Sequence, residues 1–492
     1  MAGEAEKARS LEAWDSLRAA GTASLLTRER VAIGLALLFF LATFLVYWYL
    51  GPKSTPYITH IQLANAFLHG RLDLLPELSG YIVEPALIDG KFYANHPPMP
   101  AIIVLPGVAL FGLALNQTLV SAILGAITAS VVFGVVRRVT EKLTAQVWLT
   151  VLFVFGTIFW YSASNGGVWF FAHTSAVLFL FLAIYVTLTY KHPLLAGLLL
   201  GAAFWSRQPT IFALPFFVIM FSDQWLPQSR SGTLIKRIDL KPLLWLGMGV
   251  GFFVLLHFTY NYLRFGTPLD AGYYLGGQVS ELPAVYPHGP FHISYIPRHI
   301  PIVFESLPIF TTQAPYISFS WAGMAIWATT PAFFYALFAG IRNRWVIAAG
   351  SALIFITVAL ISSRAIAAAW DLGWARQSLP NFLTIYPFFL LIALAIVTGV
   401  RNKFVIACWS AIMPIVMTIF FFAATGWAQF GYRYAMDFYP FLFLLTVKGM
   451  GDNIRWHHKL LILLSVAVNL MGVLWIFQFE PRQYLDLRWV GF

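Results

Sequence analysis

The sequence is poor in cysteine and in charge. Its one cysteine, Cys408, lies inside an apolar run, so the chain forms no intrachain disulfide and holds no cysteine-based metal site. Charged residues make up only 10% of the 492 residues, whereas hydrophobic residues make up 59%. Soluble domains usually carry about 25% charged residues. These shortages exclude a soluble enzyme.

Motifs for nucleotides, nucleic acid and metals are also missing. No glycine-rich phosphate loop occurs, which argues against direct use of a nucleoside triphosphate or a nucleotide-sugar donor. The net charge of +11 comes from basic residues spread through short loops and not from one patch, so we expect no nucleic-acid partner. Asp371 and Asp437 each stand without a second carboxylate at close spacing. A divalent cation is compatible with the chain but not indicated, and we expect no cofactor and no metal site.

Long apolar runs dominate what remains. A hydrocarbon core about 30 Å thick requires about 20 apolar residues per helix. The runs predict an all-α, polytopic membrane protein with about 13 transmembrane helices, at residues 31–50, 116–136, 144–161, 169–190, 194–206, 209–222, 243–262, 317–341, 345–361, 380–400, 404–424, 434–450 and 460–477. The fifth and sixth are too short to cross alone, so they predict a broken hairpin hinged at Arg207-Gln208-Pro209.

The positive-inside rule gives the orientation of these helices. Most lysines and arginines fall on the N-terminal side, so we expect a plasma (inner) membrane protein of the cell envelope with a cytoplasmic N-terminus and an external C-terminus. Residues 1–30 then form a cytoplasmic segment with no cleaved signal peptide, residues 31–477 the transmembrane domain, and residues 478–492 an external tail. Two large external loops cover residues 51–115, including an interfacial helix at residues 99–115, and residues 263–316.

A short unit occurs twice late in the chain, each time leading from an external loop into a returning helix. It consists of Gly-Trp-Ala, ten residues and Tyr-Pro-Phe, at residues 373–388 and 426–441. The simpler interpretation is an aromatic anchor at the membrane interface followed by a proline kink. The functional interpretation rests on Arg376 and Arg433, which lie near the outer interface, where a guanidinium binds a lipid phosphate bidentately.

Several motifs follow the first predicted helix. They read Ala-Asn-Ala-Phe-Leu-His-Gly at residues 64–70, Gly-Lys-Phe-Tyr at 90–93, His-Pro-Pro-Met at 96–99 and Leu-Phe-Gly at 110–112. Residues 51–112 thereby resemble the first external loop of GT-C glycosyltransferases, especially aminoarabinose transferases and protein mannosyltransferases that use polyprenyl-phosphate sugars. Residues 197–215 resemble the glycine-rich helix of that family, and Tyr432-Arg433-Tyr434 with Pro440 resembles its Arg-Tyr helix start.

The resemblance implies a GT-C-like fold with a large external loop after the first helix. It implies a hexosyl- or pentosyltransferase that moves a sugar from a polyprenyl-phosphate donor to a lipid, glycan or protein acceptor on the external face, in contact with membrane lipids. The chain also departs from the family. The usual Asp or Asp-Glu after the first helix falls on Thr55 and Pro56, a second Asp falls near His173, and the Lys before Pro-Pro is His96.

Transfer of a sugar from a lipid phosphate requires cations for the departing phosphate and a base for the acceptor proton. Our catalytic candidates are Glu84, Asp89 and His173, and our substrate-binding candidates are His60, Tyr93, His96, Arg207, Arg376, Arg433 and Tyr434. Some have structural alternatives. Asp89-Gly90 is a turn signal, and His173 fits a hydrogen-bonded structural group. Arg207 needs an anionic or carbonyl partner at its hinge.

Two other functions stay open at this point. A transporter or flippase of a lipid-linked substrate would use the broken hairpin and the repeated unit as parts of its path, but it should show two matched halves. A GT-C-fold subunit without catalysis would explain the missing aspartate. The sugar, the acceptor and the base are not specified by the sequence.

Overall fold

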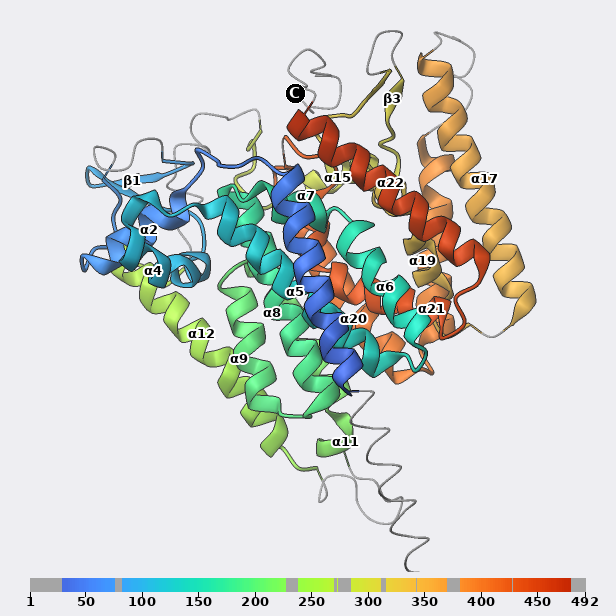
Figure 1. Ribbon diagram of the computed structural model, residues 1–492, viewed down its shortest axis with the longest axis horizontal. Coiled ribbons are helices and arrows are strands. Elements are labelled where there is room, and N and C mark those ends of the chain that lie inside the picture. Colours follow the sequence, from blue (N-terminus) through green and yellow to red (C-terminus); the bar gives the residue numbers. More distant parts are fainter. Residues whose placement is uncertain are drawn as a thin grey trace, which may run out of the picture.

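The computed structural model describes residues 29–75, 82–226, 238–269, 272, 285–310, 316–341, 343–369, 381–426 and 428–478, and most of them are helical (Figure 1). A first helix, Glu29–Leu50, is followed by α2 (Thr59–Leu68), α4 (Met99–Phe111), α5 (Gln117–Val139), α6 (Leu143–Phe155), α7 (Phe159–Asn165), α8 (Val168–Thr189), α9 (Pro193–Phe204), α10 (Leu214–Met220), α11 (Ser222–Trp225) and α12 (Lys241–Phe265). The later helices are α15 (Ile296–Phe304), α16 (Ile326–Thr329), α17 (Arg344–Ala369), α19 (Asn381–Gly399), α20 (Lys403–Phe420), α21 (Tyr439–Met450) and α22 (Trp456–Gln478).

Short 3-10 helices and strands connect these elements. The 3-10 helices are η1 (Gly112–Ala114), η2 (Gln208–Ala213), η4 (Ile293–Tyr295), η5 (Pro331–Phe338) and η6 (Arg433–Asp437). Two antiparallel hairpins are formed by β1 (Ala86–Ile88) with β2 (Lys91–Tyr93) and by β3 (Ile309–Phe310) with β4 (Ile317–Ser318). Ala86 pairs with Tyr93 across the first hairpin.

Seven helices of the described chain are long and apolar enough to cross a membrane, or eight if the bent pair α6 and α7 counts as one. The prediction of a mostly helical chain with several membrane-spanning helices is confirmed at this level. Where a full-length span was expected at residues 144–161, α6 and α7 meet at an angle of 54°. At residues 194–222, α9 ends at Phe204 and η2 begins at Gln208, so the helix breaks where the hinge was predicted.

The expected span at residues 317–341 is wrong as a single helix. The chain forms β4, α16 and η5 there. Gly323 adopts a φ of +98°, and a Cβ at this position would lie 2.9 Å from the carbonyl carbon of Gly431. Met324 and Gly431 form an isolated parallel β-bridge, which joins this part of the chain to the segment just before η6. Because this pairing needs extended backbone and Pro331 starts a new turn, one continuous helix is excluded.

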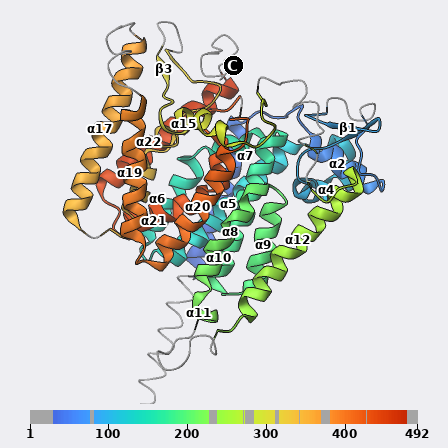
Figure 2. The ribbon, with the colours of Figure 1, turned by 180° about the vertical axis from the view of Figure 1, so that it is seen from behind.

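The loop elements gather at one end of the helical bundle. In Figure 1, α2, α4, β1, α15, β3 and the end of α22 lie toward the top, whereas α11 and the start of the first helix lie toward the bottom. Figure 2 shows the same arrangement from behind, with α12 leading up to the α2–α4 unit. The two regions expected to be external loops therefore lie at the same end, and the end of α22 lies there too.

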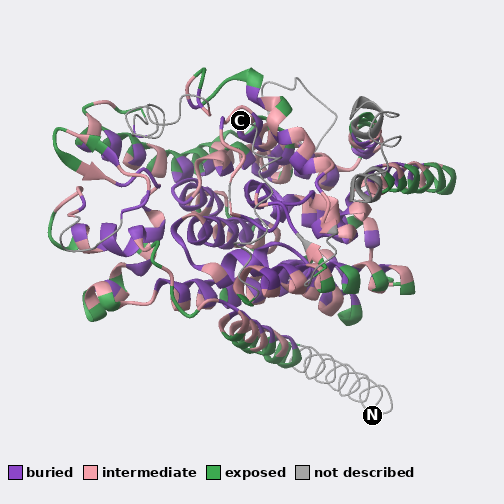
Figure 3. Cartoon of the chain, turned by 90° about the horizontal axis from the view of Figure 1, so that it is seen from above, coloured by how far each residue is buried: buried purple, intermediate pink, exposed green. Residues whose placement is uncertain are grey.

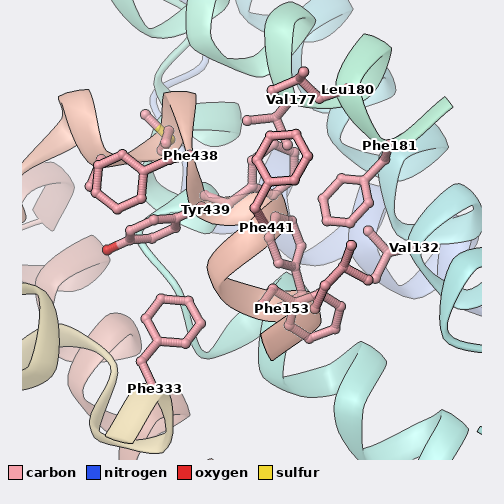
Figure 4. Close-up of a cluster of buried hydrophobic side chains, with 14 of the residues drawn as sticks. Val132, Phe153, Val177, Leu180, Phe181, Phe333, Phe438, Tyr439 and Phe441 are labelled. Carbon is pink, nitrogen blue, oxygen red and sulfur yellow. The ribbon is translucent and has the colours of Figure 1, made fainter. Parts of the chain in front are cut away.

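Aromatic side chains fill the centre of the bundle. Phe153 of α6 packs edge-on against Phe181 of α8 and Phe443 of α21, at centroid distances of 4.7 and 5.1 Å. Tyr439 of α21 packs against Phe333 of η5 at 5.0 Å, and Figure 4 shows these side chains converging around α21. In Figure 3 the central helices are largely buried, while the helix at the right edge, α17, is largely exposed. The core therefore lies around α5, α8 and α21.

The segment after the first helix is fixed to the bundle by buried hydrogen bonds. Gln117 of α5 donates to the carbonyls of Tyr57 and Gly166, at 3.1 and 2.7 Å. The amide of Met99 donates to the carbonyl of Trp205 at 3.1 Å. Helix α4 and η1 occupy residues 99–114, where an interfacial helix was expected. These contacts place the segment across the ends of α8, α9 and α12.

Candidate functional site

A cavity of about 1130 Å³ lies between the helical bundle and the segment that follows the first helix, which contributes Glu84, His96 and Pro97 to the lining. Its lining comes from residues 84–97, the start of α8, η2, α12, α15, α20 and η6. This volume is slightly above the range typical of small-molecule sites, about 300–1,000 Å³. Five of the predicted site residues line it together: Glu84, His96, Arg207, Arg433 and Tyr434.

Arg207 reaches the cavity because the chain breaks after α9. Its amide still donates to the carbonyl of Ala203, at 2.8 Å, but its backbone is extended, with φ −148° and ψ 109°. Pro209 two residues later has no N–H to continue the hydrogen bonds of α9, and it stands instead in the first turn of η2. The Arg207 side chain is thereby directed away from the helix, and it retains 20% exposure at the cavity.

Asp437 holds the Arg207 guanidinium. Its Oδ1 accepts from Arg207 Nε at 3.2 Å and its Oδ2 accepts from Arg207 Nη2 at 3.0 Å, so the pair is bidentate. Nδ1 of His173 lies 3.0 Å from the same Oδ1. Both Asp437 and His173 are fully buried. His173 therefore lies behind the cavity wall and is linked to Arg207 through Asp437.

Tyr434 lies between two guanidinium groups. The Cζ of Arg207 is 5.4 Å from its ring centroid and the Cζ of Arg433 is 5.2 Å away. Arg433 also lies 5.4 Å from the ring of Phe170, and it is only 7% exposed. Cations over aromatic faces are stabilised by the ring quadrupole. The aromatic side chains therefore hold two positive charges close together at one wall of the cavity.

Glu84 is the single carboxylate among the described lining residues. Its backbone has a φ of +48°, a strained region for a residue with a side chain, and Pro85 follows it. Its Oε2 accepts from Trp169 Nε1 at 3.3 Å, and its carbonyl accepts from Asn95 Nδ2 at 2.9 Å. The tryptophan and the asparagine thus hold this carboxylate at the cavity against an unfavourable backbone conformation.

His96 and His60 are neighbouring buried imidazoles with different surroundings. Their ring centroids are 5.9 Å apart, but only His96 lines the cavity. Nε2 of His60 donates to the carbonyl of Val168, 2.9 Å away, and so ties α2 to α8. Burial and the nearby His96 lower the pKa of His60 to about 3, and burial with the charges of Arg207 and Arg433 lowers the pKa of His96 to about 3. Both rings are therefore neutral at neutral pH.

The remaining predicted residues lie elsewhere. Asp89 and Gly90, with φ of +50° and +74°, form the exposed turn between β1 and β2. These angles are those of a tight hairpin turn, which Asp-Gly favours. Tyr93 ends β2 and packs against Phe265 at 5.9 Å. Neither Asp89 nor Tyr93 lines the cavity, and Arg376 falls outside the described residues.

Two charged residues of this site were not singled out from the sequence. Asp437 was noted only as an isolated carboxylate, although an aspartate inside a predicted span is costly without a partner and signals one. Arg298 of α15 donates from Nη1 to the carbonyls of Val285 and Ala423, at 2.7 and 3.3 Å, and lines the cavity. Within the described ranges, no group of three or more His, Cys, Asp or Glu residues is placed to hold a metal ion.

Comparisons of the chain with protein-family models, curated proteins and solved structures found no match. The likeness to GT-C glycosyltransferases therefore depends on the short motifs quoted above.

Proposed function

We propose that the protein is a membrane glycosyltransferase of the GT-C type, with about 13 membrane-crossing segments, that uses this cavity to move a sugar from a polyprenyl phosphate to a lipid, glycan or protein acceptor. The observation that carries the proposal is the joint lining of one cavity by three arginines, one carboxylate and an apolar wall. Each of these features matches one part of the reaction.

The apolar wall suits a polyprenyl chain. It includes Ile211 and Phe212 of η2 and Val254 and Phe258 of α12. Phe212 and Phe258 are 44% and 43% exposed, so this wall continues onto the outer surface of the bundle. In a membrane such a surface faces acyl chains, and an isoprenoid tail there keeps its apolar surroundings while its head enters the cavity.

The arginines suit a phosphate. Arg207, Arg298 and Arg433 bring three positive charges to the described lining. Glu84 in the lining and Asp437 behind it bring two negative charges, so these five groups carry a net charge of +1. Guanidinium groups in a site shielded from water stabilise an anion more strongly than they do in bulk water. A departing polyprenyl phosphate gains negative charge as its bond to the sugar breaks, so this arrangement favours the products of that step.

Glu84 suits the base. An acceptor hydroxyl or amine attacks the anomeric carbon, a new bond forms there, and the bond from that carbon to the phosphate oxygen breaks. The electron pair of the broken bond stays on the phosphate, which leaves as polyprenyl phosphate, and the acceptor proton passes to the Glu84 carboxylate. General-base catalysis of this kind contributes about 10²–10⁴-fold to rate.

The repeated unit gives a reason to prefer a transferase over a transporter. In the second copy, Pro440 lies in the first turn of α21. In the first copy, Pro387 lies inside α19. The two prolines thus occupy different positions in their helices, whereas a translocation path made from a duplicated element calls for equivalent ones.

A transfer assay with the purified protein in lipid nanodiscs tests the proposal. Wild type is given a panel of polyprenyl-phosphate sugars, and the release of polyprenyl phosphate is measured. We expect Glu84→Gln to lower the rate about 100-fold or more, because an amide cannot accept the proton. Asp73→Asn is the matched control, since this carboxylate of the same segment pairs with Arg71 at 3.8 Å and lies outside the cavity.

The outcomes of this assay separate the remaining possibilities. Full activity of Glu84→Gln contradicts the assignment of the base. Binding of donors without transfer by wild type favours a subunit that has lost catalysis. Failure of every polyprenyl phosphate to bind contradicts the whole class of function.

A further inference from the structure

The imidazole of His96 in the cavity lining has a buried nitrogen without a hydrogen-bond partner in the described part of the chain. His96 is 6% exposed, and its Nδ1 has no hydrogen-bond partner among the described residues. Leaving a buried polar atom without a hydrogen bond costs about 1–3 kcal/mol, so such atoms in native proteins usually meet water or a ligand. Because His96 lines the cavity, a molecule bound there lies beside this imidazole.

The charges around His96 indicate which group of a bound molecule suits this imidazole. The positively charged groups that face it are Arg207 and Arg433, and its nearest imidazole, His60, is engaged with the carbonyl of Val168. A positive charge on His96 is unfavourable beside two guanidinium groups in a buried site. The neutral ring has one donor nitrogen and one acceptor nitrogen, and its natural partner is an uncharged group such as a hydroxyl.

The neighbours of His96 supply an aromatic surface and a second polar group. The ring of Trp169 lies 6.5 Å from that of His96, at an interplanar angle of 70°. The Trp169 indole donates to the Glu84 carboxylate, which fixes the directions of both side chains. All three residues line the cavity. An aromatic ring packs against the C–H face of a sugar, while a carboxylate and a neutral imidazole hydrogen-bond its hydroxyls.

We infer that His96, Trp169 and Glu84 form the subsite for the sugar ring of the donor and that this subsite selects an uncharged, hydroxylated sugar over an acidic one. The inference rests on the proposed function and deepens it. The negative charge of Glu84 opposes a sugar carboxylate, whereas His96 satisfies a neutral hydroxyl. The phosphate lies toward the arginines, and the ring lies toward His96.

Binding measurements with three probes test this subsite. The first probe is a polyprenyl-phosphate hexose, and the second is the same polyprenyl phosphate linked to the corresponding hexuronic acid. The third is polyprenyl methyl phosphate, which keeps the phosphodiester charge but lacks the sugar ring. Affinities are measured for wild type, His96→Gln and His96→Leu in nanodiscs. His96→Gln keeps a neutral hydrogen-bonding group of similar length, so it is the matched control for His96→Leu.

For wild type we expect the hexose to bind at least tenfold more tightly than both the methyl phosphate and the hexuronic acid. His96→Leu should lose most of the hexose advantage while keeping its affinity for the methyl phosphate, and His96→Gln should retain part of that advantage. A full hexose advantage in His96→Leu, or a wild-type preference for the uronic acid, overturns the subsite but leaves the proposed function intact. Failure of wild type to bind any of the three probes overturns both.

Discussion

At the scale of single residues, the buried carboxylate of Asp437 determines the direction of Arg207. Its two oxygens contact Nε and Nη2 of the guanidinium, and Nδ1 of His173 contacts one of the same oxygens. An arginine held along one edge presents the rest of its guanidinium in a fixed direction. Asp437 therefore acts on the phosphate site through Arg207 without lining the cavity itself.

We expect Asp437→Asn to destabilise the protein by about 3 kcal/mol or more, because it leaves a largely buried guanidinium without its charged partner. Transfer activity should fall with it, chiefly through weaker donor binding. Asp223→Asn is the matched control, since its ion pair with Lys403 is solvent-exposed and such pairs contribute about 0–1 kcal/mol. The free energies of unfolding of both variants are to be measured by reversible unfolding in mixed micelles. Equal stability losses for the two variants would contradict the role of Asp437.

The pKa of His96 predicts how stability changes with pH. The folded chain holds this pKa at about 3, whereas an unfolded histidine has a pKa of about 6.5. Between these two pKa values the unfolded chain binds more protons than the folded chain. The contribution of His96 to the free energy of unfolding is therefore complete above about pH 6.5 and decreases as the pH falls toward 3. The pKa of His60 is also lowered, to about 3, so His60 changes the free energy of unfolding with pH in the same direction.

We expect His96→Gln to reduce the loss of thermal stability between about pH 7.5 and pH 5, because one of the buried histidines no longer takes up a proton on unfolding. The loss should decrease but not vanish, since His60 remains. Melting temperatures of both proteins at the two pH values measure the effect. An unchanged difference between the two pH values would rule out His96 as a contributor.

The sequence predicted the residue types of the site better than their partners. Glu84, His96, Arg207, Arg433 and Tyr434 were selected by chemistry, and all five line one cavity. The partner of Arg207 could not be selected in this way, because Asp437 lies 230 residues away along the chain. No local periodicity relates positions so far apart; the packing of both η2 and η6 against α20 brings them together.

At the scale of elements, α9 and α12 cross closely through glycines. A Cβ on Gly249 of α12 would lie 2.5 Å from the carbonyl oxygen of Leu194, and one on Gly197 of α9 would also meet the α12 backbone. Small residues at a crossing let helices approach closely within a membrane. This crossing determines how α12 carries Val254 and Phe258 to the cavity wall.

We expect Gly249→Ala to destabilise the protein by about 1–3 kcal/mol, because the added methyl forces the two backbones apart. The control is Gly247→Ala on the same helix, where a Cβ meets nothing within 4 Å. Alanine favours helix over glycine equally at both positions, so the control should be neutral or slightly stabilising. Unfolding in mixed micelles compares the two. The close crossing is disproved if Gly249→Ala behaves like Gly247→Ala.

Hydropathy predicted some elements and failed for others for a physical reason. The break near Pro209 was visible because proline removes a backbone donor wherever it occurs. The irregular path of residues 317–341 was not visible, since their apolar composition equals that of a membrane helix. Extended pairing of Met324 with Gly431 determines their structure, and hydropathy carries no information about such pairing.

At the scale of the whole molecule, both expected external loops lie at one end of the bundle (Figure 1). The turn after α8 lies at the opposite end, where Gln224 of α11 donates to the carbonyl of Lys191 at 2.8 Å. The positive-inside rule assigns the Lys191 end to the cytoplasm. We therefore expect the cavity to face the external side, where the proposed lipid-linked sugar donor would have to be presented.

Cysteine labelling tests this orientation. Cys408 is buried, so Cys408→Ser provides a background without other thiols. In intact cells a membrane-impermeant maleimide should label Leu87→Cys, which lies on the exposed hairpin, but not Lys191→Cys. Permeabilised cells should show label on both. The reverse pattern in intact cells would contradict the proposed orientation and an external active site.

The central claim is that the cavity binds the head of a polyprenyl phosphate while its tail lies along η2 and α12. Photo-crosslinking with a polyprenyl phosphate that carries a diazirine on its first isoprene unit, followed by peptide mapping, tests it most directly. We predict labelled peptides that contain Phe212 and Phe258, with labelling displaced by an unlabelled polyprenyl-phosphate sugar and weakened in Arg433→Ala. Labelling confined to α17 and α19, or labelling that no unlabelled donor displaces, would contradict the claim.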